Sequence, residues 1–286
     1  MDKTELFEWV RSNQPTKSLT QPQVNAVDNM LVTMSITDVT SNISKLNGWE
    51  LPSVVTDREY NLTYENLKKV YPSVNPDAIP FILKYANKYN ISTKKRMCSF
   101  LATCIIESNG FNAKRESFAY SAKRLTQVFP AFRIPNLKFA QDLVNKGQAG
   151  VANHLYNGRL GNRIGTNDGW DYRGNSWIQL TGRNNHYLMQ KLTGIPVGDN
   201  PKLLEYLENA CIVTMAWWNH NSLNEKSDLI NVYPDGYTLN TLDSKGKETR
   251  DYKFNTGALA VRRVVNGGLN GFDDFCKTLE KCFKYL

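Results

Sequence analysis

A single glutamate at the end of an apolar segment is the strongest candidate for acid chemistry in this sequence. The segment 97–106 is apolar almost throughout, and Glu107 follows it directly before Ser108-Asn109-Gly110. Burial among apolar side chains and the negative end of a helix dipole would both favour the neutral form of this carboxyl. A neutral carboxyl near pH 7 can serve as a general acid. The alternative is a structural glutamate satisfied by an arginine or by backbone groups.

A second carboxyl follows nine residues later, at Glu116, beside the basic pair Lys114 and Arg115. Neighbouring positive charges favour the ionised form of a carboxyl. Two carboxyls in contrasting environments are typical of sites that divide proton donation and base catalysis between them. In inverting glycosidases the second carboxylate activates water, and the two carboxyls stand about 6.5–9.5 Å apart. The alternative for Glu116 is a solvated surface residue.

Two glycine-rich segments offer groups that suit a sugar ligand. The first is Tyr172–Arg183, and the second is Val261–Gly271, a predicted helix end followed by a polar turn. Glycines allow close backbone approach, while Gln, Asn and Thr side chains provide hydrogen-bond donors and acceptors. The flat rings of Tyr172 and Trp177 could pack against sugar rings.

The elements that position these residues are predicted to be helices. Caps, stop signals and apolar periodicity predict helices over residues 75–89, 94–108, 136–146, 183–193, 201–220, 257–266 and 272–284. The stretch from Gly147 to Trp177 is rich in Gly, Asn and Arg, and this composition predicts loops, turns or a small sheet. The expected architecture is mainly α with a minor β element.

The first sixty residues form a separate small helical module in this interpretation. Two or three short helices are predicted, and the stretch from Trp49 to Asn61 is interpreted as the connection to a larger module over residues 61–286. The small module has no recognised motif, and wall binding and a purely structural role are both open for it. A second polar insert over 222–255 contains a turn at Pro234-Asp235-Gly236.

Charge is unevenly distributed between the two modules. Residues 1–60 carry 5 Lys/Arg and 8 Asp/Glu, a net charge of −3, and residues 61–286 carry 30 and 19, a net charge of +11. A basic catalytic module suits an anionic polymer. Nucleic acid is not expected, because zinc-finger spacing, an RNA-binding signature and a Lys/Arg run are all missing. Basic pairs such as Arg262-Arg263 are interpreted as solvated faces.

The remaining reactive side chains predict neither disulfides nor a metal site. Five cysteines are present, and the pairs 98/104 and 276/282 lie too far apart on helices to be bridged, so buried reduced thiols are expected. His154, His186 and His220 show no metal-ligand spacing. No apolar run is long enough to predict a transmembrane helix.

Four segments in order resemble glycoside hydrolase family 19, and the match is closer to its bacteriophage endolysin branch than to plant chitinases. These segments are the E-S-N-G-F run at 107–111, the Y-S-A-K-R-L run at 120–125, the Y-R-G-N-S-W-I-Q-L-T-G-R run at 172–183 and the N-G-G-L-N-G run at 266–271. The resemblance covers about 220 residues, from roughly Leu62 onward. It implies a lysozyme-like, two-lobed helical catalytic domain.

The resemblance also implies roles for individual residues. Glu107 is expected to be the general acid, Glu116 the general base, and Thr181 the hydroxyl that holds the attacking water. The residues expected to contact substrate are Tyr120, Tyr172, Arg173, Gln179, Tyr187 and Asn266. Family members need no metal or organic cofactor. Asn109 replaces a glycine usual at that position, and either His186 or Tyr187 fills the place of a tyrosine usual after T-G-R.

The resulting hypothesis is an inverting endolysin that cuts β-1,4 bonds of peptidoglycan. Its expected partner is the glycan strand, with no nucleic acid and no stable membrane insertion, and the chain is expected to be a monomer. Because the N-terminus lacks signal-peptide character, we expect synthesis in the host cytoplasm and action on the wall after holin-type release. The alternatives are a chitinase on the same scaffold, a lytic transglycosylase, or a non-enzymatic wall-binding or virion protein.

Overall fold

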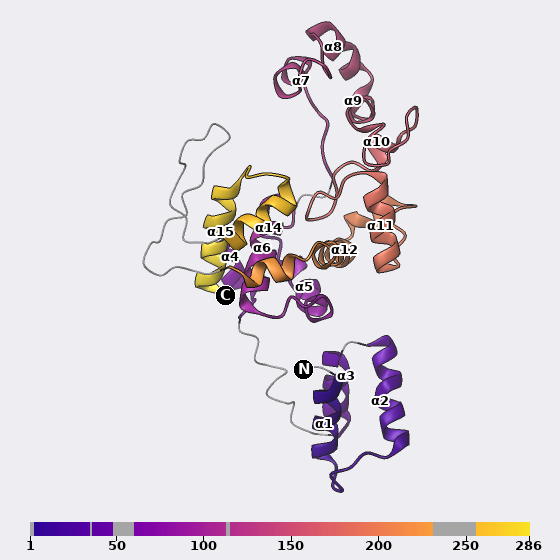
Figure 1. Ribbon diagram of the computed structural model, residues 1–286, viewed down its shortest axis with the longest axis vertical. Coiled ribbons are helices and arrows are strands. Elements are labelled where there is room, and N and C mark those ends of the chain that lie inside the picture. The colour runs from indigo at the N-terminus through magenta and orange to yellow at the C-terminus, as the bar shows by residue number, and fades with distance from the viewer. Residues whose placement is uncertain (1–2, 35, 48–59, 113–114, 231–255) are drawn as a thin grey trace. The chain divides into compact units, whose positions relative to one another are not determined.

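The computed structural model describes residues 3–34, 36–47, 60–112, 115–230 and 256–286 (Figure 1). The chain divides into two compact units, Met1–Glu59 and Tyr60–Leu286. Almost all of the predicted connection from Trp49 to Asn61, and the predicted turn at 234–236, lie outside the described residues. The start of the predicted polar insert is a helix, α13 (Leu223–Asp228).

The first unit consists of three helices around a small apolar core. These are α1 (Lys3–Asn13), α2 (Gln21–Thr33) and α3 (Ile36–Asn47). Their buried core residues are Leu6, Val10, Val27, Val39 and Ile43. At the start of α2 the backbone N–H of Thr20 donates to Oε1 of Gln23, over 2.9 Å. This bond satisfies one backbone donor at the helix start, as in a capping box.

The second unit is also helical. Its α-helices besides α13 are α4 (Tyr64–Val70), α5 (Ile79–Tyr85), α6 (Lys94–Ser108), α7 (Ala122–Val128), α8 (Leu137–Asn145), α9 (Gly147–Tyr156), α10 (Asp168–Asp171), α11 (Arg183–Thr193), α12 (Leu207–His220), α14 (Thr256–Asn266) and α15 (Phe272–Tyr285). Its 3₁₀ helices are η2 (Pro76–Ala78), η3 (Asn87–Tyr89) and η4 (Pro201–Glu205). The mainly α prediction is confirmed. Across the described ranges, no helix is long and apolar enough to cross a membrane.

Helix α6 lies at the centre of the larger of two apolar cores in this unit. It packs against α13, α14 and α15, and ten of its side chains are buried. Phe100 meets Trp218 of α12 edge to face, with ring centroids 5.5 Å apart. Because this helix is surrounded by others, the position of its last turn is fixed by packing on several sides.

A second, smaller core forms another lobe of the same unit. Its buried members come from the segment 118–155 and include Leu125, Ile134, Leu143 and Leu155. Helix α8 contacts both α7 and α9, and Figure 1 shows the three grouped apart from α14 and α15. The expected two-lobed arrangement of the catalytic domain is therefore visible as two separate apolar clusters.

Several predicted elements differ from the observed ones. The segment predicted as loops or a small sheet contains helix α9, which forms because Val151, Ala152 and Leu155 pack into the second core despite the unfavourable glycines around them. The predicted β element is reduced, in the described part of the chain, to isolated bridges that join Asn175 to Arg115 and to Leu180. The helix predicted over 75–89 is broken into η2, α5 and η3.

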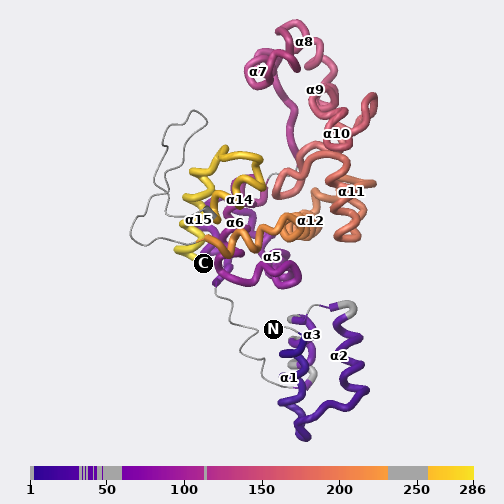
Figure 2. Tube along the Cα trace, in the orientation of Figure 1, coloured from indigo at the N-terminus to yellow at the C-terminus, as the bar shows by residue number. Residues whose placement is uncertain are grey.

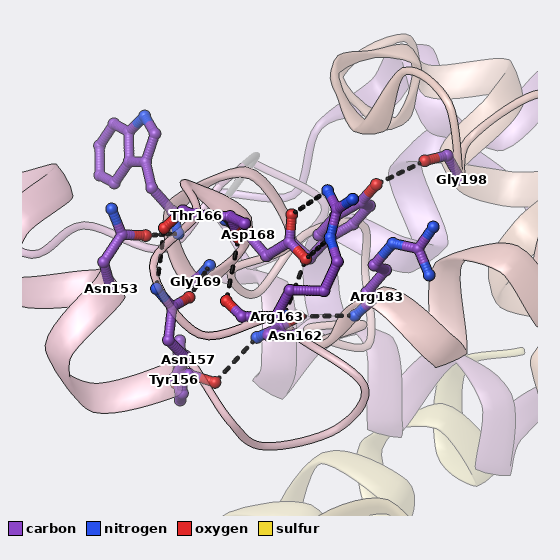
Figure 3. A network of polar contacts seen from close by, with 12 residues as sticks. Asn153, Tyr156, Asn157, Asn162, Arg163, Thr166, Asp168, Gly169, Arg183 and Gly198 are labelled. Carbon is purple, nitrogen blue, oxygen red and sulfur yellow. Dashed lines mark hydrogen bonds and ion pairs between the residues drawn. The ribbon is translucent and has the colours of Figure 1, made fainter.

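A buried aspartate fixes the connection between α9 and α10 (Figure 3). Asp168 accepts hydrogen bonds of 2.9 Å from the backbone N–H, Nε and Nη2 of Arg163. In the same connection, Asn162 donates to the Tyr156 carbonyl and accepts from the backbone N–H of Arg183. Hydrogen bonds from Arg163 lower the pKa of Asp168 from 3.8 to about 2. This network ties the end of α9 to the start of α11.

We predict that Asp168→Asn lowers the free energy of unfolding by about 2 kcal/mol at pH 7. A lowered carboxyl pKa stabilises the folded state above the ordinary value of 3.8, and that contribution disappears as the pH falls toward 2. The difference between the two proteins in urea unfolding should therefore shrink across this pH range. Asp142→Asn is the control, because its pair with Lys138 is exposed on α8. An equal loss in both variants would contradict the prediction.

Candidate active site

The end of α6 is closed by a compact turn that positions Glu107. The Ser108 hydroxyl donates to the Cys104 carbonyl and accepts from the backbone N–H of Phe111, over 2.6 and 2.8 Å. Asn109 has φ 53°, so it takes the left-handed conformation common at helix ends. A Cβ at Gly110 would lie 2.7 Å from the Tyr71 ring, so a glycine is required there. The replacement of the family glycine by Asn109 is therefore compatible with this turn.

The Glu107 carboxyl pairs with the guanidinium of Arg262 on α14. Nη1 of Arg262 donates to Oε1 of Glu107, and the side chains are 3% and 16% exposed, respectively. The predicted apolar surroundings of Glu107 are therefore incomplete, since a buried cation contacts its carboxyl. This is the arginine-satisfied arrangement that the sequence left open. An ion pair of this kind holds the carboxyl in one orientation.

The glycine-rich turn after α14 forms a cradle for the same arginine. Nε of Arg262 donates to the Asn270 carbonyl over 2.9 Å, and Nη2 donates to the same oxygen. A Cβ at Gly271 would lie 2.9 Å from Nη2, and Gly271 has φ 68°. The interpretation of Arg262 as part of a solvated face is wrong, because Nε, Nη1 and Nη2 of its guanidinium all donate hydrogen bonds inside the protein. The neighbouring Arg263 is exposed.

Glu116 lies in a different polar environment, against the segment that begins at Tyr172. The Tyr156 hydroxyl donates to both of its carboxylate oxygens at 3.1 Å, and the Gly174 backbone N–H donates to Oε2 at 3.2 Å. Burial raises the pKa of Glu116 above its ordinary 4.5, and the bonds from Gly174 and Tyr156 and the charge of Arg173 oppose that rise. The environment therefore combines desolvation with donors that hold the carboxylate.

The expectation that the neighbouring basic pair favours the ionised form of Glu116 is not met by Arg115, and burial raises the pKa of Glu116 instead. The Arg115 guanidinium donates to the Asp171 carbonyl, and its Nη1 lies 3.7 Å from Oε1 of Glu205. Its charge therefore interacts with these groups and not with the Glu116 carboxyl. Lys114 lies outside the described residues. Among the described residues, Arg173 favours the ionised form of Glu116, and its Nε donates to the Glu116 backbone carbonyl at 2.9 Å.

The segment from Gly174 to Thr181 forms a tight loop that lies against Glu116 and packs beside the end of α6. A Cβ at Gly174 would lie 2.4 Å from Oε1 of Gln179 and 3.2 Å from Oε2 of Glu116. Trp177 packs edge to face on Phe111, four residues after Glu107, with ring centroids 4.7 Å apart. The loop therefore brings Gln179 close to Glu116 while its tryptophan anchors it beside the end of α6.

The other predicted site residues fall into two groups. Thr181, Tyr120 and Tyr187 are half-buried, and Asn266 is exposed at the end of α14. The Thr181 hydroxyl donates to the Gln179 carbonyl. Tyr172 and Arg173 are buried, and the Tyr172 hydroxyl donates to the Gly198 carbonyl at 2.8 Å. Substrate contact by these residues stays a prediction, and the Tyr172 hydroxyl already donates its proton to Gly198.

Two residues at the site were not selected from the sequence. Arg262 was not chosen because a basic pair on a helix usually faces solvent. Tyr156 belongs to α9, which was interpreted as a loop, so no helical face was assigned to it.

His186 is fully buried against the Tyr172 ring, and burial lowers its pKa to about 4. Tyr187 is therefore the more accessible candidate for the family tyrosine. Within the described residues, no cluster of His, Cys, Asp and Glu could hold a metal ion.

The chain has a relative that is described at family level. It is 30% identical over 210 residues to a Haemophilus influenzae protein described as a glycosyl hydrolase family 19 domain-containing protein. The similarity covers 73% of this chain and 89% of that relative. No family model matches the chain. The similarity extends over most of both proteins and is not confined to one motif.

We predict that Tyr156→Phe raises the pKa of Glu116 further. The hydroxyl stabilises the ionised carboxylate, so its removal favours the protonated form. Carboxyl carbon shifts followed by NMR during a pH titration measure this change, and Glu116→Gln identifies the resonance. Tyr120→Phe is the matched control, because both rings pack on Phe118. An unchanged or lowered pKa in Tyr156→Phe would contradict the assigned hydrogen bonds.

Proposed function

Because the chain belongs to glycoside hydrolase family 19 and is a glycoside hydrolase, we propose that it hydrolyses peptidoglycan. The bond cut is the β-1,4 linkage between N-acetylated sugars, and the reaction inverts the anomeric configuration. The observation that carries this proposal is the presence of two carboxyls in unlike environments. One is paired with a buried arginine at a helix end, and the other is held by a hydroxyl and a backbone amide.

Glu107 is the general acid in this proposal. It acts in its protonated form, gives that proton to the leaving glycosidic oxygen and becomes the carboxylate of the ion pair with Arg262. Arg262 contacts Oε1, so Oε2 is the atom that delivers the proton. The adjacent guanidinium stabilises the negative charge that forms on Glu107 as the bond breaks, and this stabilisation is greater after proton transfer than before it. The ion pair therefore serves the reaction as well as the fold.

Glu116 is the general base that takes a proton from the attacking water. Its raised pKa makes the carboxylate a stronger base than an exposed glutamate, while Tyr156 and Gly174 hold its oxygens. The Thr181 hydroxyl is proposed to hold the water, and Gln179, beside Glu116, to contact the sugar. On acidification, the base is neutralised at a higher pH than an ordinary glutamate would be.

The finer proposal is an endolysin of the bacteriophage type, made in the host cytoplasm and acting on the wall after holin-type release. The four ordered motifs support this branch of the family. The net charge of +11 on residues 61–286 suits a wall that carries peptide carboxylates and associated anionic polymers. No metal or organic cofactor enters the proposed reaction.

Turbidity loss of permeabilised bacteria, compared with sugar release from colloidal chitin, tests the substrate. Mass spectrometry of digested peptidoglycan tests the reaction, because hydrolysis leaves reducing ends and a lytic transglycosylase leaves anhydro sugars. Anhydro ends would exclude Glu116 as a base for water. Preferential chitin cleavage would favour a chitinase, and wall binding without cleavage would favour a structural wall protein.

We predict that Glu107→Gln lowers the rate of peptidoglycan hydrolysis by about 10²–10⁴ while the fold is kept. The amide retains the shape of the carboxyl but carries no acidic proton. Reducing-end release at saturating substrate and the far-UV circular dichroism spectrum measure the two effects. Glu116→Gln should also lose most of its turnover with glycan binding intact. Near-native hydrolysis by either purified variant would remove the corresponding role.

We predict that Arg262→Lys lowers the free energy of unfolding by about 1–3 kcal/mol. A lysine cannot contact Glu107 and the Asn270 carbonyl together with the same fork geometry. Turnover should fall by about 10- to 100-fold because Glu107 is displaced, with little change in KM. Arg263→Lys on the exposed side of α14 is the matched control, and its stability should change by less than about 0.5 kcal/mol. Equal effects in both variants would contradict the positioning role.

A further inference from the structure

The outer end of the second lobe carries more positive than negative charge. Residues 121–141, here called the basic tip, contain Lys123, Arg124, Arg133 and Lys138 and no Asp or Glu. They span α7, the connecting turn and the first part of α8. Figure 2 shows α7 and α8 at the end of this lobe, well away from α14 and α15. In the described part of the chain, only Lys138 of the four has an acidic partner, Asp142.

The basic tip also exposes large apolar side chains. Phe132 is 83% exposed, Leu137 57%, Val128 42% and Phe139 36%. Leu125, Ile134 and Ala140 of the same segment are buried in the second core, and Phe139 packs edge to face on His154. Phe132 and Leu137 are therefore the apolar side chains of the basic tip that face solvent most. Exposed apolar groups gathered at one place usually mark an interaction surface.

The turn that presents Phe132 is held rigidly to the protein. Nη1 of Arg133 donates to the Leu155 carbonyl at 3.4 Å, and the Arg133 carbonyl contacts Nε2 of His154 at 2.8 Å. The backbone N–H of Ile134 donates to the Pro130 carbonyl. Because these bonds fix the turn, the exposure of Phe132 follows from the fold and not from a loose loop.

An adjacent groove extends this surface along α8 and α9. It has a volume of about 600 Å³, and its lining includes Phe139, Leu143, Lys146 and Ile164. Ile164 is 85% exposed, and Lys146 has no acidic partner among the residues that the structure describes. Asp142 and His154 also line the groove, so it continues the apolar surface of the basic tip beside charges of both signs.

We propose that the basic tip binds the surface of an anionic lipid bilayer. Phe132 and Leu137 enter the interface between headgroups and acyl chains, and Lys123 and Arg124 contact anionic headgroups. Peripheral helices that combine exposed apolar side chains with Lys and Arg bind such surfaces. The binding is peripheral and differs from insertion of a spanning helix.

Other occupants fit these observations less well. An anionic sugar polymer would match the charge and could stack a sugar ring on Phe132, but it gives Leu137 and Val128 no hydrocarbon to enter. A second copy of this chain would cover the apolar side chains but would bring two sets of like charges together. The proposal does not depend on the peptidoglycan activity, since none of these residues is assigned a role in hydrolysis.

Co-sedimentation of the full chain with vesicles tests the proposal. We expect binding to vesicles that contain phosphatidylglycerol, weak or no binding to pure phosphatidylcholine, and weaker binding as salt is raised. The variant Phe132→Ser/Leu137→Ser should bind about tenfold more weakly or worse. The variant Lys123→Gln/Arg124→Gln should lose about fivefold for each charge. Glu107→Gln should bind like the unaltered chain, so vesicle binding is measured independently of hydrolysis.

The matched control is Lys191→Gln/Leu192→Ser on α11, where Leu192 is 46% exposed and Lys191 is also exposed. It should bind vesicles like the unaltered chain, and thermal unfolding of all variants checks that they fold. Equal binding to both vesicle types, or unaltered binding by the tip variants, would overturn the proposal. A concentration-dependent mass abolished by Phe132→Ser would instead indicate a second copy. Loss of soluble glycan cleavage with vesicle binding intact would place these side chains in the glycan site.

Discussion

The ion pair between Glu107 and Arg262 constrains much of the larger unit. Both side chains are mostly withdrawn from water, and leaving one buried charge of such a pair alone typically costs about 3–5 kcal/mol. Helix α14 must therefore present Arg262 at one position relative to the end of α6. The turn after α14 must then direct the Asn270 carbonyl toward the guanidinium and leave no Cβ at Gly271.

The second carboxyl depends on a different set of constraints. Glu116 is held by Tyr156 from α9 and by Gly174 from the loop before α11. The position of Tyr156 depends in turn on the connection from α9 to α10, where Asn162 binds the Tyr156 carbonyl and Asp168 binds Arg163. The two lobes thus contribute different carboxyl environments, a buried cation in one case and a hydroxyl with a backbone amide in the other.

The sequence predicted helices best where local signals and packing agree. The bounds of α6 and α11 match their predicted ranges, since each begins and ends at residues suited to those positions. Helix α9 was missed because glycine and asparagine weaken the local signal, whereas Val151 and Leu155 gain burial only when the second core forms. The segment 75–89 shows the reverse case, in which a strong start signal at Asn75-Pro76 leads into three short helices.

Taken alone, the sequence identified the family motifs, the mainly helical class, and Glu107 at the end of an apolar helix. These follow from residue type and near-neighbour spacing, which act over a few turns of chain. Only the tertiary structure decided which charges meet those carboxyls. Arg262 lies 155 positions from Glu107 and Tyr156 lies 40 positions from Glu116, so neither contact leaves a periodic signal. Such partners are chosen by the packing of whole helices, because a buried charge or a withdrawn carboxylate must find its donor wherever the fold brings one.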